Sequence, residues 1–373
     1  MQRLDPLPAP ATGPIPSLDG IRALAVALVF FAHTGFEKVA PGGLGVTIFF
    51  VLSGYLISTL LRIEHARTNA IDFQSFYLRR LLRLMPPLLV IVLIAHLLAS
   101  LDLVNGDFTW GGFFSALFYF GNYYVIAQDF HGMPSGIGVV WSLAVEEHYY
   151  LFYPPLAALL LRTGRIELSV SVLAGLCVAV LAWRYWLALH GATQAYIGMA
   201  TDTRIDAILI GCLMALWRNP WLDPEAWPER YDWLVVLGCV LVLIGSLVYR
   251  DEFFRLTLRY TLQSLAIAPL IYLAVARAHR APFRWLNARP LVYLGTISYT
   301  VYLAHHFILF MITKHWPQME WGLLLLTTGV LTWAVAEMMR RWVEQPSATL
   351  RKQLHQSRSR QTAHDPLRPA GTP

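Results

Sequence analysis

A basic side chain and an imidazole interrupt the first apolar stretch of the chain, residues 17–36, which reads SLDGIRALAVALVFFAHTGF. Arg22 lies near one end of this stretch, and His33 lies eleven residues further along. Eleven residues of α-helix advance about 16.5 Å and return almost to the starting direction, so both side chains face the same way. Imidazole titrates near neutral pH and accepts protons from hydroxyl groups, so His33 is a candidate general base. The structural alternatives are a histidine that bonds a neighbouring helix and an arginine that reaches the membrane surface.

A cluster of arginines forms the second candidate site, in the sequence FYLRRLLRLMPP. Arg79, Arg80 and Arg83 fall on neighbouring positions of a helix, just before an apolar run. Guanidinium groups bind phosphates through paired hydrogen bonds, so the cluster predicts a site for the phosphates of a nucleotide-bearing acyl carrier. Anchoring of the helix to anionic lipid is the alternative interpretation.

Adjacent carboxylates form the third candidate site, within VVWSLAVEEHYYLFYPP. Glu146, Glu147 and His148 interrupt a run that is otherwise apolar and aromatic. Two carboxylates at membrane depth are costly to bury, so at least one is expected to pair with a cation or to be protonated. Arg22 and the arginine cluster are the expected partners. A buried ion pair that fixes the helix register is the structural alternative.

Weaker polar positions occur in other apolar segments, and each has a structural role as its alternative. In TDTRIDAIL, Asp202 and Asp206 share one helical face while Arg204 points away, a pattern that also suits a capped helix start. The remaining positions are His305, His306, Glu337 and Glu344.

The elements that must position these residues are helices in a membrane. Of the 373 residues, 56% are hydrophobic and only 14% are charged, and the mean hydropathy is +0.50, as in multi-span membrane proteins. The net charge of +6 comes from basic residues grouped between apolar runs, which indicates anionic lipid head groups rather than nucleic acid. The cysteines, Cys177, Cys212 and Cys239, lack CxxC spacing, so we expect neither disulfides nor a metal site. The predicted fold class is an all-α integral membrane protein.

The basic loops between the apolar runs predict the topology. Such loops stay in the cytoplasm, which places the arginine-rich connection before residue 84, the segment 277–289 and the C-terminal tail inside. Seven apolar runs lie between the first two of these loops, and an even number must cross, so one run does not span. The short run 204–217 is the first candidate, as a re-entrant segment, and 109–127 is the second. We therefore predict a bundle of about ten transmembrane helices with both termini in the cytoplasm.

Three regions are expected along the chain. Residues 1–16, with five prolines, form a disordered lead-in before Ser17, a suitable helix N-cap. Residues 17–346 form the transmembrane domain, and residues 347–373 form a basic, polar cytoplasmic tail whose last dozen residues are expected to be disordered. The first apolar run lacks a convincing cleavage site, so we expect it to remain as an uncleaved signal anchor.

Together these residues resemble the acyltransferase-3 family, integral membrane O-acyltransferases that modify bacterial surface glycans, antibiotics and related sugars. The family's first helix carries Arg or Lys and, after ten further residues, His, which match Arg22 and His33. Its other motifs match GVTIFFVLSGYLI, the arginine cluster followed by Pro86, WSLAVEEHYY and the closing VEQP. The resemblance extends from about Ser17 to Pro346. One departure is His148, where the family has Gln.

The resemblance implies transfer of an acyl group, most often acetyl, from acyl-coenzyme A to a hydroxyl of a glycan or glycosylated acceptor, with no tightly bound cofactor. The arginine cluster would hold the donor's phosphates, and Arg22 would join it or stabilise negative charge on the thioester carbonyl. His33 would act as general base or as a transient acyl relay, and Glu146 or Glu147 would orient or charge-balance the imidazole.

The resemblance also implies a multi-pass protein of the bacterial inner membrane. Some members carry an extracytoplasmic hydrolase-like domain with a serine nucleophile; we expect none in this chain, so such a partner would be a separate protein. A function of another class is the main alternative: a transporter or flippase for a polar or lipid-linked solute, whose path the buried charges would line. A scaffold without catalysis would leave the cost of these charges unexplained.

Overall fold

The computed structural model describes residues 14–223 and 228–363, and within these ranges the chain is built from helices and forms no β-strand. The expected disordered segments at 1–16 and at the C-terminal end fall mainly outside these ranges. The α-helices are α1 (Leu18–Phe31), α2 (Gly42–Thr68), α3 (Phe73–Ser100), α4 (Trp110–Leu117), α5 (Gly121–Ala127), α6 (Val140–Arg162), α7 (Ile166–Leu189), α8 (Gln194–Met199), α9 (Thr201–Trp217), α10 (Asp232–Val248), α11 (Glu252–Leu256), α12 (Leu258–Ala276), α13 (Arg289–His315), α14 (Trp321–Met339) and α15 (Gln345–Ala363). Short 3₁₀ or π-helical turns cover Ala32–Phe36, Ile137–Val139, Glu229–Tyr231, Phe283–Asn287 and Arg340–Glu344.

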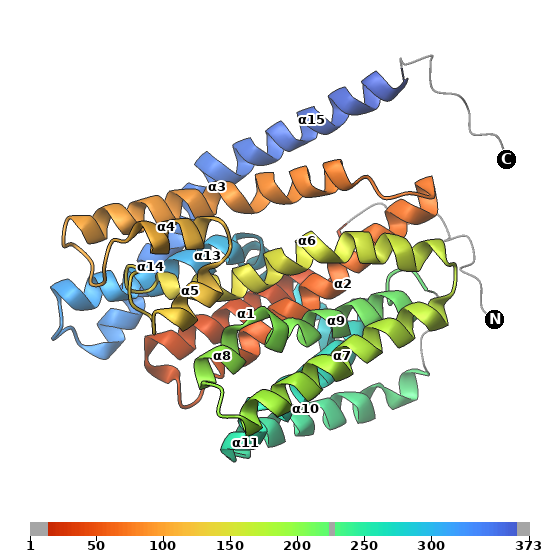
Figure 1. Cartoon of the computed structure of the whole chain (residues 1–373), viewed down its shortest axis with the longest axis horizontal. Helices are drawn as coiled ribbons and strands as arrows, with labels where there is room; N and C mark the ends of the chain where they lie inside the picture. Colours follow the sequence, from red (N-terminus) through yellow and green to blue (C-terminus); the bar gives the residue numbers. More distant parts are fainter. Residues whose placement is uncertain (1–13, 224–227, 364–373) are drawn as a thin grey trace.

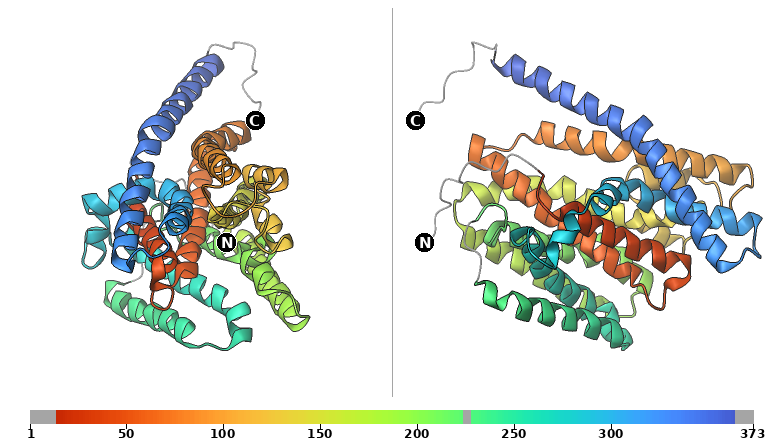
Figure 2. Two further views of the ribbon diagram at one scale, coloured as in Figure 1. Left: turned by 90° about the vertical axis from the view of Figure 1, so that its left-hand side faces the viewer. Right: turned by 180° about the vertical axis from the view of Figure 1, so that it is seen from behind.

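The long helices lie side by side in one bundle (Figure 1). α2 occupies its centre and packs against α1, α6, α9 and α12. α1 packs between α2 and α13, and α14 packs against α13. α15 packs along α3, and its C-terminal end projects away from the bundle in both views of Figure 2.

Eight helical segments of the described chain are long and apolar enough to cross a membrane, so the protein is a multi-pass membrane protein. They are Leu18–Phe36, Gly42–Thr68, Phe73–Ser100, Ile166–Leu189, Glu229–Val248, Leu258–Ala276, Arg289–His315 and Trp321–Leu354. Two further long helices lie alongside them: α6 carries the two adjacent glutamates, and α9 has only 17 residues. The count of about ten spans requires both of these helices to cross and stays a prediction.

The two candidates for a non-spanning run differ in structure. The run 204–217 lies within the single helix α9, which packs against α2 and α7. The run 109–127 is broken into α4 and α5, because Tyr119 between them has a φ of 60°. These helices have 8 and 7 residues, too few to span a bilayer. The break makes 109–127 the better candidate, and the parity of the basic loops is kept.

Glycines allow α2 and α9 to approach with their backbones in contact. A Cβ atom on Gly54 would lie 1.9 Å from the carbonyl oxygen of Ile208, and a Cβ atom on Gly211 would lie 2.1 Å from that of Val51. Small residues favour such contacts between membrane helices, where van der Waals packing is a main source of association. The contact holds α9 against the middle of α2.

We expect Gly54→Ala to destabilise the protein by about 1–3 kcal/mol, because the added methyl group would overlap backbone atoms of α9. Gly175→Ala on α7 is the matched control, since a Cβ atom there meets no atom within 4 Å. Alanine favours the helix, so this control is expected to keep its stability or to gain about 0.5–1 kcal/mol. Unfolding of both variants in detergent measures the difference. Equal stability of the two would contradict a tight α2–α9 contact.

The start of α1 differs from the expected N-cap. Ser17 precedes the helix, but its φ is 65° and its side chain caps no backbone N–H. Its backbone N–H donates to Asn287 Oδ1 at 2.7 Å, and its hydroxyl accepts from Asn287 Nδ2 at 3.0 Å. Since Asn287 lies two residues before the first residue of α13, these bonds place the starts of α1 and α13 together.

Candidate active site

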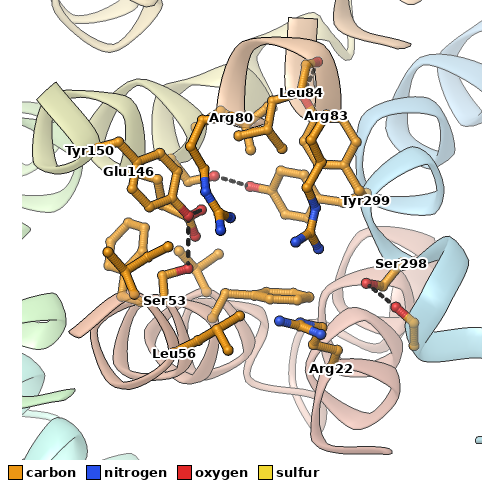
Figure 3. Close-up of a pocket in the computed structure, with 18 of the residues that line it drawn as sticks. Arg22, Ser53, Leu56, Arg80, Arg83, Leu84, Glu146, Tyr150, Ser298 and Tyr299 are labelled. Carbon is orange, nitrogen blue, oxygen red and sulfur yellow. Dashed lines mark hydrogen bonds between the residues drawn. The ribbon is translucent and has the colours of Figure 1, made fainter. Parts of the chain in front are cut away.

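A small cavity of about 100 Å³, here termed the arginine cavity, lies among α1, α2, α3, α6 and α13. Its polar lining comprises Arg22, Ser53, Arg80, Arg83, Ser142, Glu146, Tyr150, Thr296, Ser298, Tyr299 and Tyr302. Arg80 and Arg83 are close to one helical turn apart on α3, so they share a face. Arg22 reaches in from α1, and the three guanidinium groups point toward one space (Figure 3).

Positive charge dominates the arginine cavity. Arg22 has a carboxylate partner, Asp19, at 2.6 Å. Within residues 14–223 and 228–363, no carboxylate lies within ion-pair distance of Arg80 or Arg83. The Arg80 guanidinium lies 5.7 Å from the ring centroid of Tyr150, and its buried Nε has no hydrogen-bond partner. Buried cations without counter-charge are costly, so this cavity is suited to an anionic ligand.

Arg79, the first residue of the sequence cluster, lies outside the arginine cavity. Arg79 is four residues before Arg83, a spacing that would allow the two to share a face, but the Arg79 side chain extends toward α2. Its guanidinium lies 3.3 Å from the carboxylate of Glu64 on α2, and its side chain is 32% exposed. The structure therefore brings Arg80 and Arg83 together with Arg22 and separates Arg79 from them.

The two adjacent glutamates also differ in position. Glu146 lines the arginine cavity, where the Tyr150 hydroxyl lies 3.0 Å from its Oε2 (Figure 3), and Glu147 does not line it. Glu146 thus shares a space with the three arginines but forms no ion pair with them among the described residues. We expected one of these carboxylates beside His33. The structure instead places His33 in a second cavity with a different hydrogen-bond partner.

The second cavity, of about 540 Å³, is here termed the histidine cavity. It adjoins the arginine cavity, because Val46 and Tyr302 line both. Its remaining side chains with polar or aromatic groups are His33, Glu37, Phe130, Ser135, Trp141, His306 and Phe310. Arg22 and His33 thus line different but adjoining cavities. A space of this size, lined by aromatic rings and a few polar groups, is typical of a site for a small organic ligand.

The end of α1 determines where His33 lies. Residues Ala32–Phe36 form a wide π-helical turn in place of a regular one. Gly35 then takes a φ of 101°, which glycine adopts readily and other residues do not, and the helix ends. The Trp321 indole donates a hydrogen bond to the carbonyl oxygen of Thr34 at 3.0 Å. These contacts fix the turn that carries His33 against the start of α14.

Two histidines of α13 contact the His33 ring. His305 Nε2 lies 2.8 Å from His33 Nδ1, and the His306 ring stacks on that of His33 at 4.1 Å with an interplanar angle of 11°. The sequence identified these two residues only as weaker polar positions, and two consecutive histidines in an apolar helix were the available signal. No group of His, Cys, Asp and Glu in the described ranges is arranged to hold a metal ion.

A buried ion pair lies apart from both cavities. Arg184 of α7 and Asp206 of α9 are 2.6 Å apart, and both side chains are fully buried. Arg204 points from α9 in another direction, also into the bundle. It lies 3.2 Å from Thr47 Oγ1 and 3.9 Å from the ring centroid of Tyr260. The sequence identified Asp206 as a polar position but gave no sign of its partner.

The remaining candidate positions make contacts outside both cavities. His148 Nδ1 of α6 lies 2.7 Å from Thr201 Oγ1 of α9. Glu337 pairs with an arginine one turn further along the chain, and Glu344 accepts a hydrogen bond from the Thr300 hydroxyl of α13 at 2.6 Å.

Comparison with known proteins identifies the family. A family model described as an acyltransferase domain matches residues 15–337. Peptidoglycan O-acetyltransferase OatA of Listeria monocytogenes is 30% identical over an alignment of 350 residues that covers 89% of this chain and 55% of that protein. Putative peptidoglycan O-acetyltransferase YrhL of Bacillus subtilis is 31% identical over an alignment of 361 residues that covers 90% of this chain and 55% of that protein. O-acetyltransferase OatA of Staphylococcus aureus is 29% identical over 354 residues, with coverages of 89% and 57%.

The chain spans about half the length of these curated relatives. No solved structure matches it significantly. The matched region includes every residue that lines the arginine and histidine cavities. This confirms the family resemblance: the chain belongs to the acyltransferase-3 family and is a membrane acyltransferase.

Proposed function

We propose that this protein transfers an acetyl group from acetyl-coenzyme A to a hydroxyl of a cell-envelope glycan or glycosylated acceptor. The observation that carries the proposal is that a cavity lined by three arginines adjoins a cavity lined by His33, with Tyr302 in the wall of both. An anionic donor needs the cationic lining of the first cavity, and a hydroxyl acceptor needs the base in the second. Relatives named as peptidoglycan O-acetyltransferases support acetyl as the group transferred and a glycan as the acceptor.

The arginine cavity is assigned to the donor. Arg80 and Arg83 hold phosphate oxygens of coenzyme A through charge-assisted hydrogen bonds. Arg22 binds with them or stabilises negative charge on the thioester carbonyl oxygen. The cavity, at about 100 Å³, is smaller than a typical ligand pocket, so the donor's entry requires it to widen.

The histidine cavity is assigned to the acceptor. In the direct route, the acceptor hydroxyl attacks the thioester carbonyl, its proton passes to His33, the C–S bond breaks, and coenzyme A leaves as the thiol after taking up a proton. In the relay route, the His33 imidazole attacks the thioester carbonyl first, the C–S bond breaks and coenzyme A leaves. The acceptor hydroxyl then attacks the acetyl group on the imidazole, the C–N bond breaks, and the hydroxyl proton passes by way of the imidazole to the departing thiolate or to solvent. Both routes end with an ester on the acceptor and free coenzyme A.

α1 orders the two cavities across the membrane. Its start is bonded to Asn287, within the basic segment 277–289 that the positive-inside rule places in the cytoplasm. His33 lies at its other end, so the histidine cavity is nearer the outer face. In this proposal the protein lies in the bacterial inner membrane with both termini in the cytoplasm. The acceptor reaches the histidine cavity from outside, with or without a separate extracytoplasmic partner protein.

Substitution of an arginine that lines the arginine cavity should weaken donor binding more than substitution of Arg79. We expect Arg83→Gln to raise the KM for acetyl-coenzyme A by about tenfold or more, because a hydrogen bond to a charged group contributes about 1.5–3 kcal/mol. Arg79→Gln is the matched control, and its expected change is under about threefold, since Arg79 pairs with Glu64 outside the cavity. Initial rates of thiol release against donor concentration measure both. Equal effects of the two substitutions would contradict the assignment of the cavity.

Thiol release by the purified protein tests the proposed function. The protein in nanodiscs is supplied with acetyl-coenzyme A, with and without a surface-glycan extract. Release stimulated by the extract, with a mass increase of the glycan by one acetyl group, is the expected result. Movement of solute across liposomes without thiol release would favour a transporter instead.

A further inference from the structure

We propose that His305 is a positioning residue that fixes the His33 imidazole in the tautomer with its proton on Nδ1, so that Nε2 is the basic nitrogen presented to the histidine cavity. This inference rests on the proposed function for its catalytic meaning. The tautomer itself follows from the hydrogen bonds of α1 and α13, and it can be measured without any turnover.

The backbone of α13 determines the proton position on His305. His305 Nδ1 lies 2.8 Å from the carbonyl oxygen of Tyr302 and 3.1 Å from that of Val301. Carbonyl oxygens only accept hydrogen bonds, so Nδ1 must carry the proton. The His305 side chain is 0% exposed, and a second proton would place an uncompensated positive charge in the bundle. His305 is therefore neutral, and its Nε2 is an acceptor.

The proton position on His33 follows from that of His305. The two atoms 2.8 Å apart are His33 Nδ1 and His305 Nε2, and one of them must donate. Because His305 Nε2 is an acceptor, His33 Nδ1 carries the proton. A neutral imidazole has one N–H group, so the lone pair of His33 is on Nε2. His33 lines the histidine cavity, and Nε2 is its only nitrogen left for a molecule bound there.

His306 restrains the orientation of the same ring. It stacks face to face on His33 at 4.1 Å, while His305 holds one edge through its hydrogen bond. Contact at one edge and one face leaves the ring little freedom to flip. A flipped ring would exchange the positions of carbon and nitrogen and lose the bond to His305. His305 and His306 thus fix the tautomer and orientation of His33, a role that a carboxylate commonly has for catalytic histidines. Neither Glu146 nor Glu147 therefore needs to contact His33.

Nitrogen NMR of histidine-labelled protein in nanodiscs tests the tautomer. The signal of His33 is identified as the one missing from the His33→Ala spectrum. We expect a proton on Nδ1 in the wild type and loss of this preference in His305→Phe, which keeps a ring but removes the acceptor. His305→Gln is the second variant, because its amide oxygen restores an acceptor. A proton on Nε2 of His33 in the wild type would overturn the proposal.

Kinetics test the catalytic consequence. We expect His305→Phe to lower kcat by about 100-fold, within the range of general base catalysis, with the KM for acetyl-coenzyme A changed less than about threefold. His305→Gln is expected to recover about tenfold of that loss. His315→Phe, the same change at an exposed position of α13, is the control and should match the wild type. Equal kcat values of the folded Phe and Gln variants would contradict a role through the acceptor atom. Absence of thiol release in the wild type would contradict the proposed function, and the NMR result would still decide the tautomer.

Discussion

Replacing His33 by alanine is expected to lower acetyl transfer by about 10²–10⁴-fold, the contribution usually made by a general base. The substitution removes the imidazole that the turn Ala32–Phe36, at the end of α1, places in the wall of the histidine cavity. The side chain borders an open cavity, but its loss leaves the buried His305 Nε2 without this hydrogen bond, so we expect a folded protein that is less stable by about 1–3 kcal/mol. Thiol release and mass spectrometry of the acceptor, at matched protein amounts, measure the effect.

His190→Ala is the matched control for this prediction. His190 is exposed directly after α7 and lines neither cavity. Its ring forms a hydrogen bond with the carbonyl oxygen of Trp186. Its loss should leave transfer within about twofold of the wild type, as for ordinary surface positions. Residual turnover of His33→Ala within tenfold of the wild type would contradict a catalytic role. Acid-quenched protein without acceptor distinguishes the two routes, since only the relay route produces acetylated His33.

The sequence predicted the positions of the helices more accurately than the points at which they are interrupted. Apolar runs of about 20 residues identify membrane helices by composition, and most of the runs became long helices. The run 109–127 contains no charged residue, but it bends at Tyr119, where the φ is 60°. Glycines near this bend, such as Gly112, contact the backbone of a distant loop. Such a break depends on tertiary contacts and is not visible in hydropathy.

The same distinction applies to the site. Position on a helical face is a local property, so the sharing of one cavity by Arg80 and Arg83 follows from their spacing. The separation of Arg79 does not, because Arg79 and Arg83 are also helical neighbours, and it depends on the ion pair of Arg79 with Glu64 of α2. Partners between helices depend on how the helices pack. His33 and His305 are separated by 272 positions, and no pattern in either helix indicates that they meet. The expected contact between His33 and a glutamate came from the family resemblance, and helix packing places Glu146 in the arginine cavity.

Loss of the buried carboxylate in α9 is expected to be the most destabilising single change. Asp206→Asn should lower the free energy of unfolding by about 3–5 kcal/mol, because it leaves the fully buried Arg184 without its counter-charge. Glu229→Gln is the matched control: its ion pair with Arg280 has both side chains more than half exposed, and we expect less than about 1 kcal/mol. Reversible unfolding in mixed detergent micelles compares the two.

A double substitution separates the net contribution of the ion pair to the free energy of unfolding from the cost of removing only one partner. Replacing both partners, as Arg184→Met with Asp206→Leu, removes the charges together and restores apolar packing, so we expect most of the stability lost in Asp206→Asn to return. Neither residue lines a cavity, so acetyl transfer by the double variant should stay close to that of the wild type. If the double variant were as unstable as the single one, the network around Thr261, which accepts from Arg184 and donates to Asp206, would need the charges themselves. The ion pair would then be part of the specific packing of α7, α9 and α12 rather than a replaceable contact.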